Sequence, residues 1–166
     1  MFGFFRRWLE RRRYRRTVEA WLAAAFRGFP AGTLAAARAG LDLEGTVRHQ
    51  CGAGVDPVSC AVYELRLLVG GMIERMDPAE RADCLARVQN RDTGAPFYRG
   101  LDYLFEVLDR MQAAPGVSQH LVESFPYFVV GKLQGLTSQE VDAWWAEAAL
   151  QTMSPSQPVR ELAKAG

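Results

Sequence analysis

The chain has 166 residues, enough for a single domain with a buried core, and its 49% hydrophobic and 23% charged residues are ordinary for a globular protein. This composition excludes a disordered chain and a fibrous protein. The formal net charge of +1 does not point to an acidic or a basic partner for the protein as a whole.

Charge is nevertheless distributed unevenly along the chain. Residues 1–27 contain eight arginines and two glutamates, a balance of +6, whereas residues 28–166 contain 12 basic and 17 acidic residues, a balance of −5. Such asymmetry is typical of a basic arm that docks on an acidic surface. The alternative is that the arm folds back on the acidic remainder of its own chain.

The N-terminal arm combines its arginines with large apolar residues. The residues that we expect to bind a partner or a membrane are Phe2, Phe4, Phe5, Arg6, Arg7, Trp8, Leu9, Arg11, Arg12, Arg13, Arg15 and Arg16. Aromatic rings beside cations are typical of an amphipathic helix at the surface of an anionic membrane. An acidic protein fits the same composition.

Nucleic acid is a further possible partner, since arginine neutralises phosphates and aromatic rings stack on bases. However, the phenylalanines precede the arginines and do not alternate with them. This order favours an apolar tip that enters lipid or the groove of a protein. The remaining alternative is a core helix whose far end is simply solvated.

Helical periodicity follows the arm directly. The first apolar stripe consists of Val18, Trp21, Leu22, Ala25, Phe26 and Phe29, at spacings of three and four residues. Gly28 and Pro30 end this helix. A short helix or turn is expected over residues 33–39, and Asp42 can cap another short helix that runs to about Gly52.

The clearest helix begins at Asp56-Pro57, because an aspartate cap and a first-turn proline are strong start signals. Its apolar stripe consists of Val58, Val62, Leu65, Val69, Met72 and Met76. We expect this helix to cross the core. Gly70 and Gly71 predict a close contact with another helix, and a kink is the alternative.

Asp77-Pro78 repeats the start signal for a helix that ends near Asn90, and an apolar stripe from Phe97 to Met111 predicts the next one. Residues 117–136 are harder to assign, because Pro126 interrupts a helical pattern and the following four residues also suit a strand. A lone strand has nothing to pair with, so we expect a kinked or split helix.

Residues 137–140, Thr-Ser-Gln-Glu, form a capping box that starts a last helix. Trp144 and Trp145 lie about 100° apart on that helix. Either both rings belong to the core, or one of them belongs to a surface that binds a partner.

The sequence contains no pattern typical of an enzyme, a metal site or a cofactor site. His49, Cys51, Cys60 and Cys84 do not have the spacing of zinc ligands. His49 and His120 are the only histidines, and no third group that would orient a Cys–His nucleophile is indicated. We therefore expect no catalytic residues, no metal and no cofactor.

The sequence has three cysteines, a number that is too small, and odd, for a disulfide framework. We therefore expect a reducing, cytoplasmic location, where the protein can also bind peripherally at the inner face of a membrane. No apolar segment approaches the length of a membrane span. Arg15-Arg16 before an apolar run resembles an export signal, but Glu19 interrupts it and the run is short. We expect no export.

Together these patterns predict an all-α, single-domain bundle of six or seven helices. Residues 1–16 would form the arm and the start of the first helix, residues 17–153 the helical domain, and residues 154–166 a flexible tail. The expected function is that of a non-catalytic adaptor, chaperone-like or immunity-type protein, which docks through its arm on an anionic membrane or an acidic protein. A nucleic-acid-binding protein and an enzyme without recognisable motifs are the alternatives.

Overall fold

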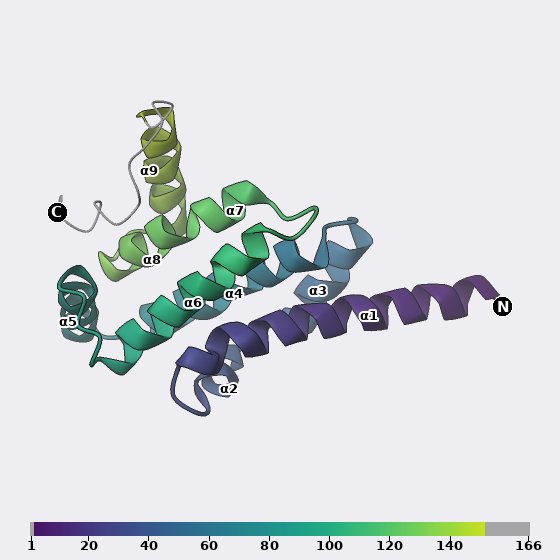
Figure 1. Ribbon diagram of the computed structural model, residues 1–166, viewed down its shortest axis with the longest axis horizontal. Coiled ribbons are helices and arrows are strands. Elements are labelled where there is room, and N and C mark those ends of the chain that lie inside the picture. The colour runs from purple at the N-terminus through teal and green to yellow at the C-terminus, as the bar shows by residue number, and fades with distance from the viewer. Residues whose placement is uncertain (1, 152–166) are drawn as a thin grey trace.

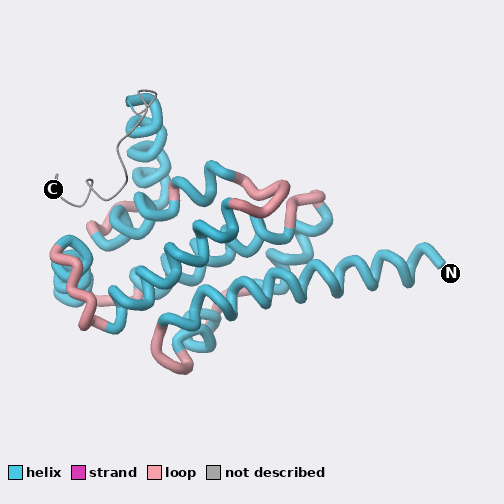
Figure 2. Tube along the Cα trace, in the orientation of Figure 1, coloured by secondary structure: helices cyan, strands magenta, loops and turns pink. Residues whose placement is uncertain are grey.

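Helices and their connecting loops make up the whole described part of the protein. The computed structural model describes residues 2–151, and the side chains of residues 5–150. Within this range it contains no strand (Figure 2). The helices are α1 (Phe2–Ala25), the 3-10 helix η1 (Phe26–Gly28), α2 (Thr33–Arg38), α3 (Leu43–Gly52), α4 (Pro57–Glu74), α5 (Pro78–Gln89), α6 (Pro96–Gln112), α7 (Gln119–Glu123), α8 (Phe125–Leu133) and α9 (Ser138–Gln151).

The predicted all-α, single-domain fold is confirmed. The described residues hold nine α-helices, more than the six or seven expected, because short segments such as α2 and α7 each form a separate helix. The expected tail, residues 154–166, lies outside the described residues.

The predicted helix starts are present as hydrogen bonds. The Asp56 carboxylate accepts from the backbone N–H of Val58 at 2.8 Å and begins α4. At α5, Asp77 and Glu80 accept each other's backbone N–H groups in a capping box. Each aspartate stabilises amides that would otherwise lack a partner in the first turn.

Helix α4 is the central element, as predicted. It contacts α1, α2, α3, α7 and α8. In Figure 1 it runs behind α6 through the middle of the molecule, between α1 on one side and α8 on the other. Seven of its apolar residues have no exposed surface: Cys60, Ala61, Val62, Leu65, Leu68, Val69 and Ile73. Burial of this stripe from several sides at once stabilises the bundle.

The two glycines of α4 have different surroundings. A Cβ atom added to Gly70 would lie 2.8 Å from Cζ of Phe128 on α8, so the predicted close helix contact is confirmed there. A Cβ added to Gly71 would meet only Nη1 of Arg75, at an ordinary 3.5 Å. The same prediction is wrong for Gly71, because this glycine lies one helical position away from the side that faces α8.

Residues 117–136 form the predicted split helix. Helix α7 ends at Glu123, and α8 begins at Phe125 with Pro126 in its first turn, where its missing N–H costs no hydrogen bond. Val141 of α9 packs directly against the buried Gly131 of α8. From this contact α9 rises away from the rest of the bundle (Figure 1).

Candidate functional site

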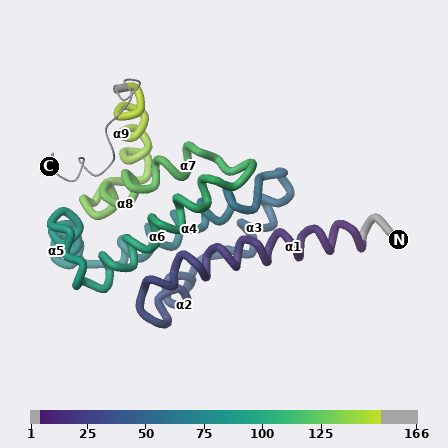
Figure 3. The backbone as a smooth tube through the Cα atoms, viewed as in Figure 1, coloured from purple at the N-terminus to yellow at the C-terminus, as the bar shows by residue number. Residues whose placement is uncertain are grey.

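The predicted arm is the first half of one continuous helix. Helix α1 begins at Phe2 and enters the body without a break, and its N-terminal half extends beyond α3 (Figure 3). No glycine or proline interrupts residues 4–25. Because the packed half supplies the helix nucleus, each added arm residue gains a backbone hydrogen bond without a new nucleation cost. The side chains of Phe2 and Phe4 lie outside the described residues.

The arm carries three large apolar side chains that the body does not cover. Phe5 is 61% exposed, Trp8 45% and Leu9 36%. The rings of Phe5 and Trp8 stack with their centroids 5.8 Å apart. We call these three residues the arm tip, and their clustering leaves an apolar patch at the end of the molecule.

The arm arginines surround and follow this patch. All seven are exposed: Arg6, Arg7, Arg11, Arg12, Arg13, Arg15 and Arg16. Arg6 pairs with Glu10 at 3.1 Å on the arm itself, and Arg15 pairs with Glu44 of α3 at 3.4 Å. In the described part of the chain the other five form no ion pair. The alternative in which the arm folds back on its own acidic body is therefore wrong, since only one arginine contacts an acidic group there.

The apolar residues of α1 lie on two opposite sides of the helix. The core stripe of α1 comprises Tyr14, Val18, Leu22 and Ala25, which pack against the body. Leu9 precedes Val18 by nine residues, which is half a turn beyond two full turns of helix. The outer face of α1, opposite the core stripe, comprises Phe5, Leu9, Arg12, Arg16, Ala20 and Ala23, all of them exposed. The arm is thus not part of one amphipathic helix, because its apolar side and the core stripe point in opposite directions.

A polar cluster lies beneath α1, inside the bundle. Glu64 of α4 has no exposed surface, and neither of its carboxylate oxygens has a hydrogen-bond partner among the described residues. The Tyr14 hydroxyl is also buried and lies against the thiol of Cys60, which is one turn before Glu64 and fully buried. Tyr14, within the segment expected to be the arm, is therefore part of the packed body.

Burial changes the acid–base behaviour of this cluster. It raises the pKa of the Glu64 carboxyl to about 7, because loss of water outweighs the attraction of nearby Arg38, and Glu19 and Asp42 add repulsion. Burial likewise raises the pKa of the Cys60 thiol to about 11. The sequence offered one signal for Glu64: the residues three and four positions away on either side, Cys60, Ala61, Leu67 and Leu68, are all apolar.

Arg38 links this cluster to the surface of α1. Its Nη2 lies 2.6 Å from Oε2 of Glu19, while its buried Nε has no hydrogen-bond partner in the described part of the chain. Arg38 therefore neutralises Glu19 at short range and attracts the Glu64 carboxyl from the same position.

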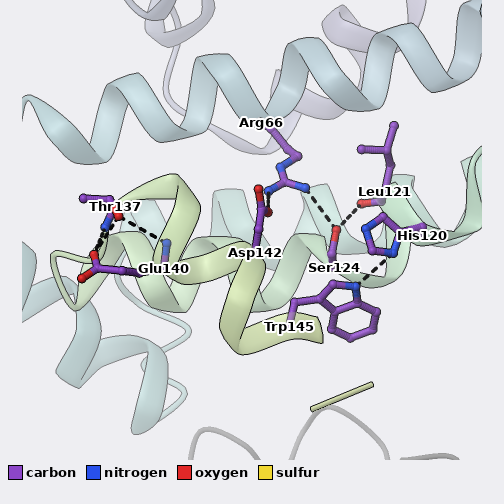
Figure 4. A network of polar contacts seen from close by, with 8 residues as sticks. All are labelled: Arg66, His120, Leu121, Ser124, Thr137, Glu140, Asp142 and Trp145. Carbon is purple, nitrogen blue, oxygen red and sulfur yellow. Dashed lines mark hydrogen bonds and ion pairs between the residues drawn. The ribbon is translucent and has the colours of Figure 1, made fainter. Parts of the chain in front are cut away.

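A second polar network attaches α9 to the bundle (Figure 4). The Arg66 guanidinium of α4 donates to Asp142 of α9 at 2.9 Å and to the Ser124 hydroxyl at 3.2 Å. The Trp145 indole N–H donates to Nδ1 of His120 at 3.1 Å.

Both tryptophans of α9 pack around one ring. The centroid of Tyr127 lies 5.1 Å from that of Trp144 and 4.8 Å from that of Trp145. Both tryptophans are half-buried. The alternative in which both rings belong to the core is not borne out, because both are only half-buried and pack on Tyr127.

The remaining candidate groups form no reactive constellation in the described residues. The cysteines are unpaired, and the His, Cys, Asp and Glu side chains form no group of three that could hold a metal ion within that range. His49 is exposed on α3. Among the helices described, none is long and apolar enough to cross a membrane.

Comparison with protein-family models, curated proteins and solved structures gives no match to this chain.

Proposed function

We propose that the protein is a non-catalytic adaptor that docks on an anionic membrane surface through the outer face of α1. One observation carries this proposal: the exposed Phe5 and Leu9 and the unpaired Arg12 and Arg16 lie on the side of α1 that points away from the body. A flat surface can therefore approach the outer face without meeting the rest of the bundle.

The composition of this face fits a lipid surface better than a nucleic acid. Apolar burial contributes roughly 1.5–3 kcal/mol for each large side chain that leaves water completely. Each arginine near an anionic surface adds about 1 kcal/mol. A nucleic-acid duplex would contact the arginines through its phosphates and would leave Phe5 and Leu9 in water.

Docking requires no rearrangement of the core. The core stripe of α1 stays packed on the body, because it lies on the opposite side of the helix from the docking residues. Apolar burial and the attraction of the arginines to anionic lipid are thus both available to the folded protein.

Flotation with phosphatidylcholine vesicles, with and without phosphatidylglycerol, tests the proposal at two salt concentrations. We expect the wild type to float only with the anionic vesicles, and to float less at higher salt because screening weakens the arginine contribution. The double variant Phe5→Ala/Trp8→Ala should bind more weakly at both salt concentrations, since apolar burial is not screened. Tyr63→Ala is the matched control, because Tyr63 is an exposed aromatic residue on α4, away from the arm.

If the wild type stays in the soluble fraction with anionic vesicles, the membrane proposal is wrong. A gel-shift titration and a sedimentation measurement would then show whether the arm binds nucleic acid or a second copy of the chain.

A further inference from the structure

We infer that Arg12, Arg15 and Arg16 form a seat for the phosphate of a phosphomonoester lipid. This inference rests on the proposed membrane function and specifies the headgroup that the docking face selects. The seat is a shallow concavity of about 560 Å³ on α1, lined by Arg12, Arg15, Arg16, Glu19, Ala20 and Ala23.

Helical spacing places the three arginine side chains around one stretch of α1. Arg12 and Arg16 are four residues apart and Arg15 lies between them, so all three side chains leave neighbouring turns of α1. Ala20 and Ala23 end in methyl groups and leave the concavity open to an incoming headgroup.

The single carboxylate that lines the seat is already neutralised. Glu19 accepts from Arg38 at 2.6 Å, and Arg38 reaches it from α2, outside the lining of the concavity. Arg12 and Arg16 have no ion pair among the described residues, and Arg15 has only the exposed contact with Glu44 at 3.4 Å. The seat is therefore cationic, and an anion meets little competition from acidic side chains.

Arg12 is also oriented in advance. Its guanidinium lies over the Trp8 ring, 5.3 Å from the centroid. This cation–π contact satisfies none of the guanidinium N–H donors with an oxygen, so they stay available to oxygen acceptors. The same contact joins the seat to the arm tip, so that one helical segment binds phosphate and enters the apolar layer beside it.

The expected ligand follows from counting acceptors and charges. A phosphomonoester has three free oxygens and a charge of about −1.5 to −2 at neutral pH, and thus offers bidentate contacts to more than one arginine. A phosphodiester headgroup has two free oxygens and one charge. The arm arginines attract both kinds of lipid, but the seat favours the phosphomonoester.

The test compares phosphatidylcholine vesicles that contain phosphatidic acid with vesicles that contain phosphatidylglycerol, adjusted to equal surface charge. We expect the wild type to bind the phosphatidic acid vesicles about tenfold more tightly. Arg12→Gln/Arg16→Gln should remove this preference. Arg7→Gln/Arg11→Gln is the matched control: it removes the same charge at the same spacing, from the opposite side of the arm, and should weaken binding to both vesicles while keeping their ratio.

Equal binding of the wild type to both vesicles refutes the seat but leaves the membrane function standing. Failure to bind either vesicle refutes both. Loss of the preference in the Arg7/Arg11 variant also refutes the seat, because general charge would then explain the selectivity. If glycerol phosphate at constant ionic strength displaces the protein from phosphatidic acid vesicles completely, the seat takes a soluble phosphomonoester, and the lipid assignment is wrong.

Discussion

Replacing the buried Glu64 with glutamine should make the stability of this protein less dependent on pH. The carboxyl has a pKa of about 7 in the folded protein and an ordinary value of 4.5. Below pH 4.5 the folded and unfolded chains both hold the proton. Between pH 4.5 and 7 the unfolded chain releases it while the folded protein retains it, so the free energy of unfolding falls as pH rises. Above pH 7 both forms are ionised and this contribution changes no further.

The size of the effect follows from the two pKa values. Their difference corresponds to about 3 kcal/mol of unfolding free energy, and Glu64 has no exposed surface through which water would reduce it. Glu64→Gln keeps the shape and removes the titration. We therefore expect the variant to match the wild type near pH 4.5 and to exceed its stability by about 2–3 kcal/mol at pH 8.

Urea denaturation followed by tryptophan fluorescence at several pH values between 4.5 and 8 measures this difference. Glu106→Gln, on the exposed side of α6, is the matched control and should follow the wild-type pH profile. Parallel profiles for the wild type and Glu64→Gln would refute the reasoning, because they would mean that the Glu64 carboxyl has the same pKa in both states.

Two further predictions concern the attachment of α8 and α9 to α4. Gly70→Ala should lower the free energy of unfolding by about 1–3 kcal/mol, because its Cβ would lie 2.8 Å from Phe128. Gly71→Ala should raise it by about 0.5–1 kcal/mol through helix propensity alone. Urea denaturation measures both, and a larger loss of stability at Gly71 than at Gly70 would contradict the assigned packing. Arg66→Met should remove the contacts to Asp142 and Ser124, so amide hydrogen exchange should rise in α9 before it rises in α4. Unchanged exchange would show that the packing of α9 on α8 holds α9 in place without Arg66.

Local signals in the sequence predicted most of the helices correctly. The caps at Asp56 and Asp77 and the capping box at Thr137 involve residues within three positions of each other, so the chain itself places their partners together. The split at Ser124 was predicted for the same reason, since Pro126 acts on its own helix.

The contacts that define the interior and the docking face were not predictable in this way. Arg38 meets Glu19 and approaches Glu64 only because α2 packs between elements distant in sequence. The difference between Gly70 and Gly71 depends on which side of α4 meets α8. The arm residues were identified from composition. That Phe5 and Leu9 lie opposite the core stripe could be inferred only once α1 was known to continue unbroken from the arm into the body.

Because α1 is unbroken, it connects the arm rigidly to the bundle. Its 24 residues span about 36 Å, and no glycine or proline provides a hinge between the arm tip and the core stripe. A surface that holds the tip and the seat therefore also fixes the tilt and rotation of the whole bundle relative to that surface. Because α9 rises from the side of α4 opposite α1 (Figure 1), a bundle docked through the outer face of α1 would hold α9 pointing away from the surface, with Trp144 and Trp145 halfway along it.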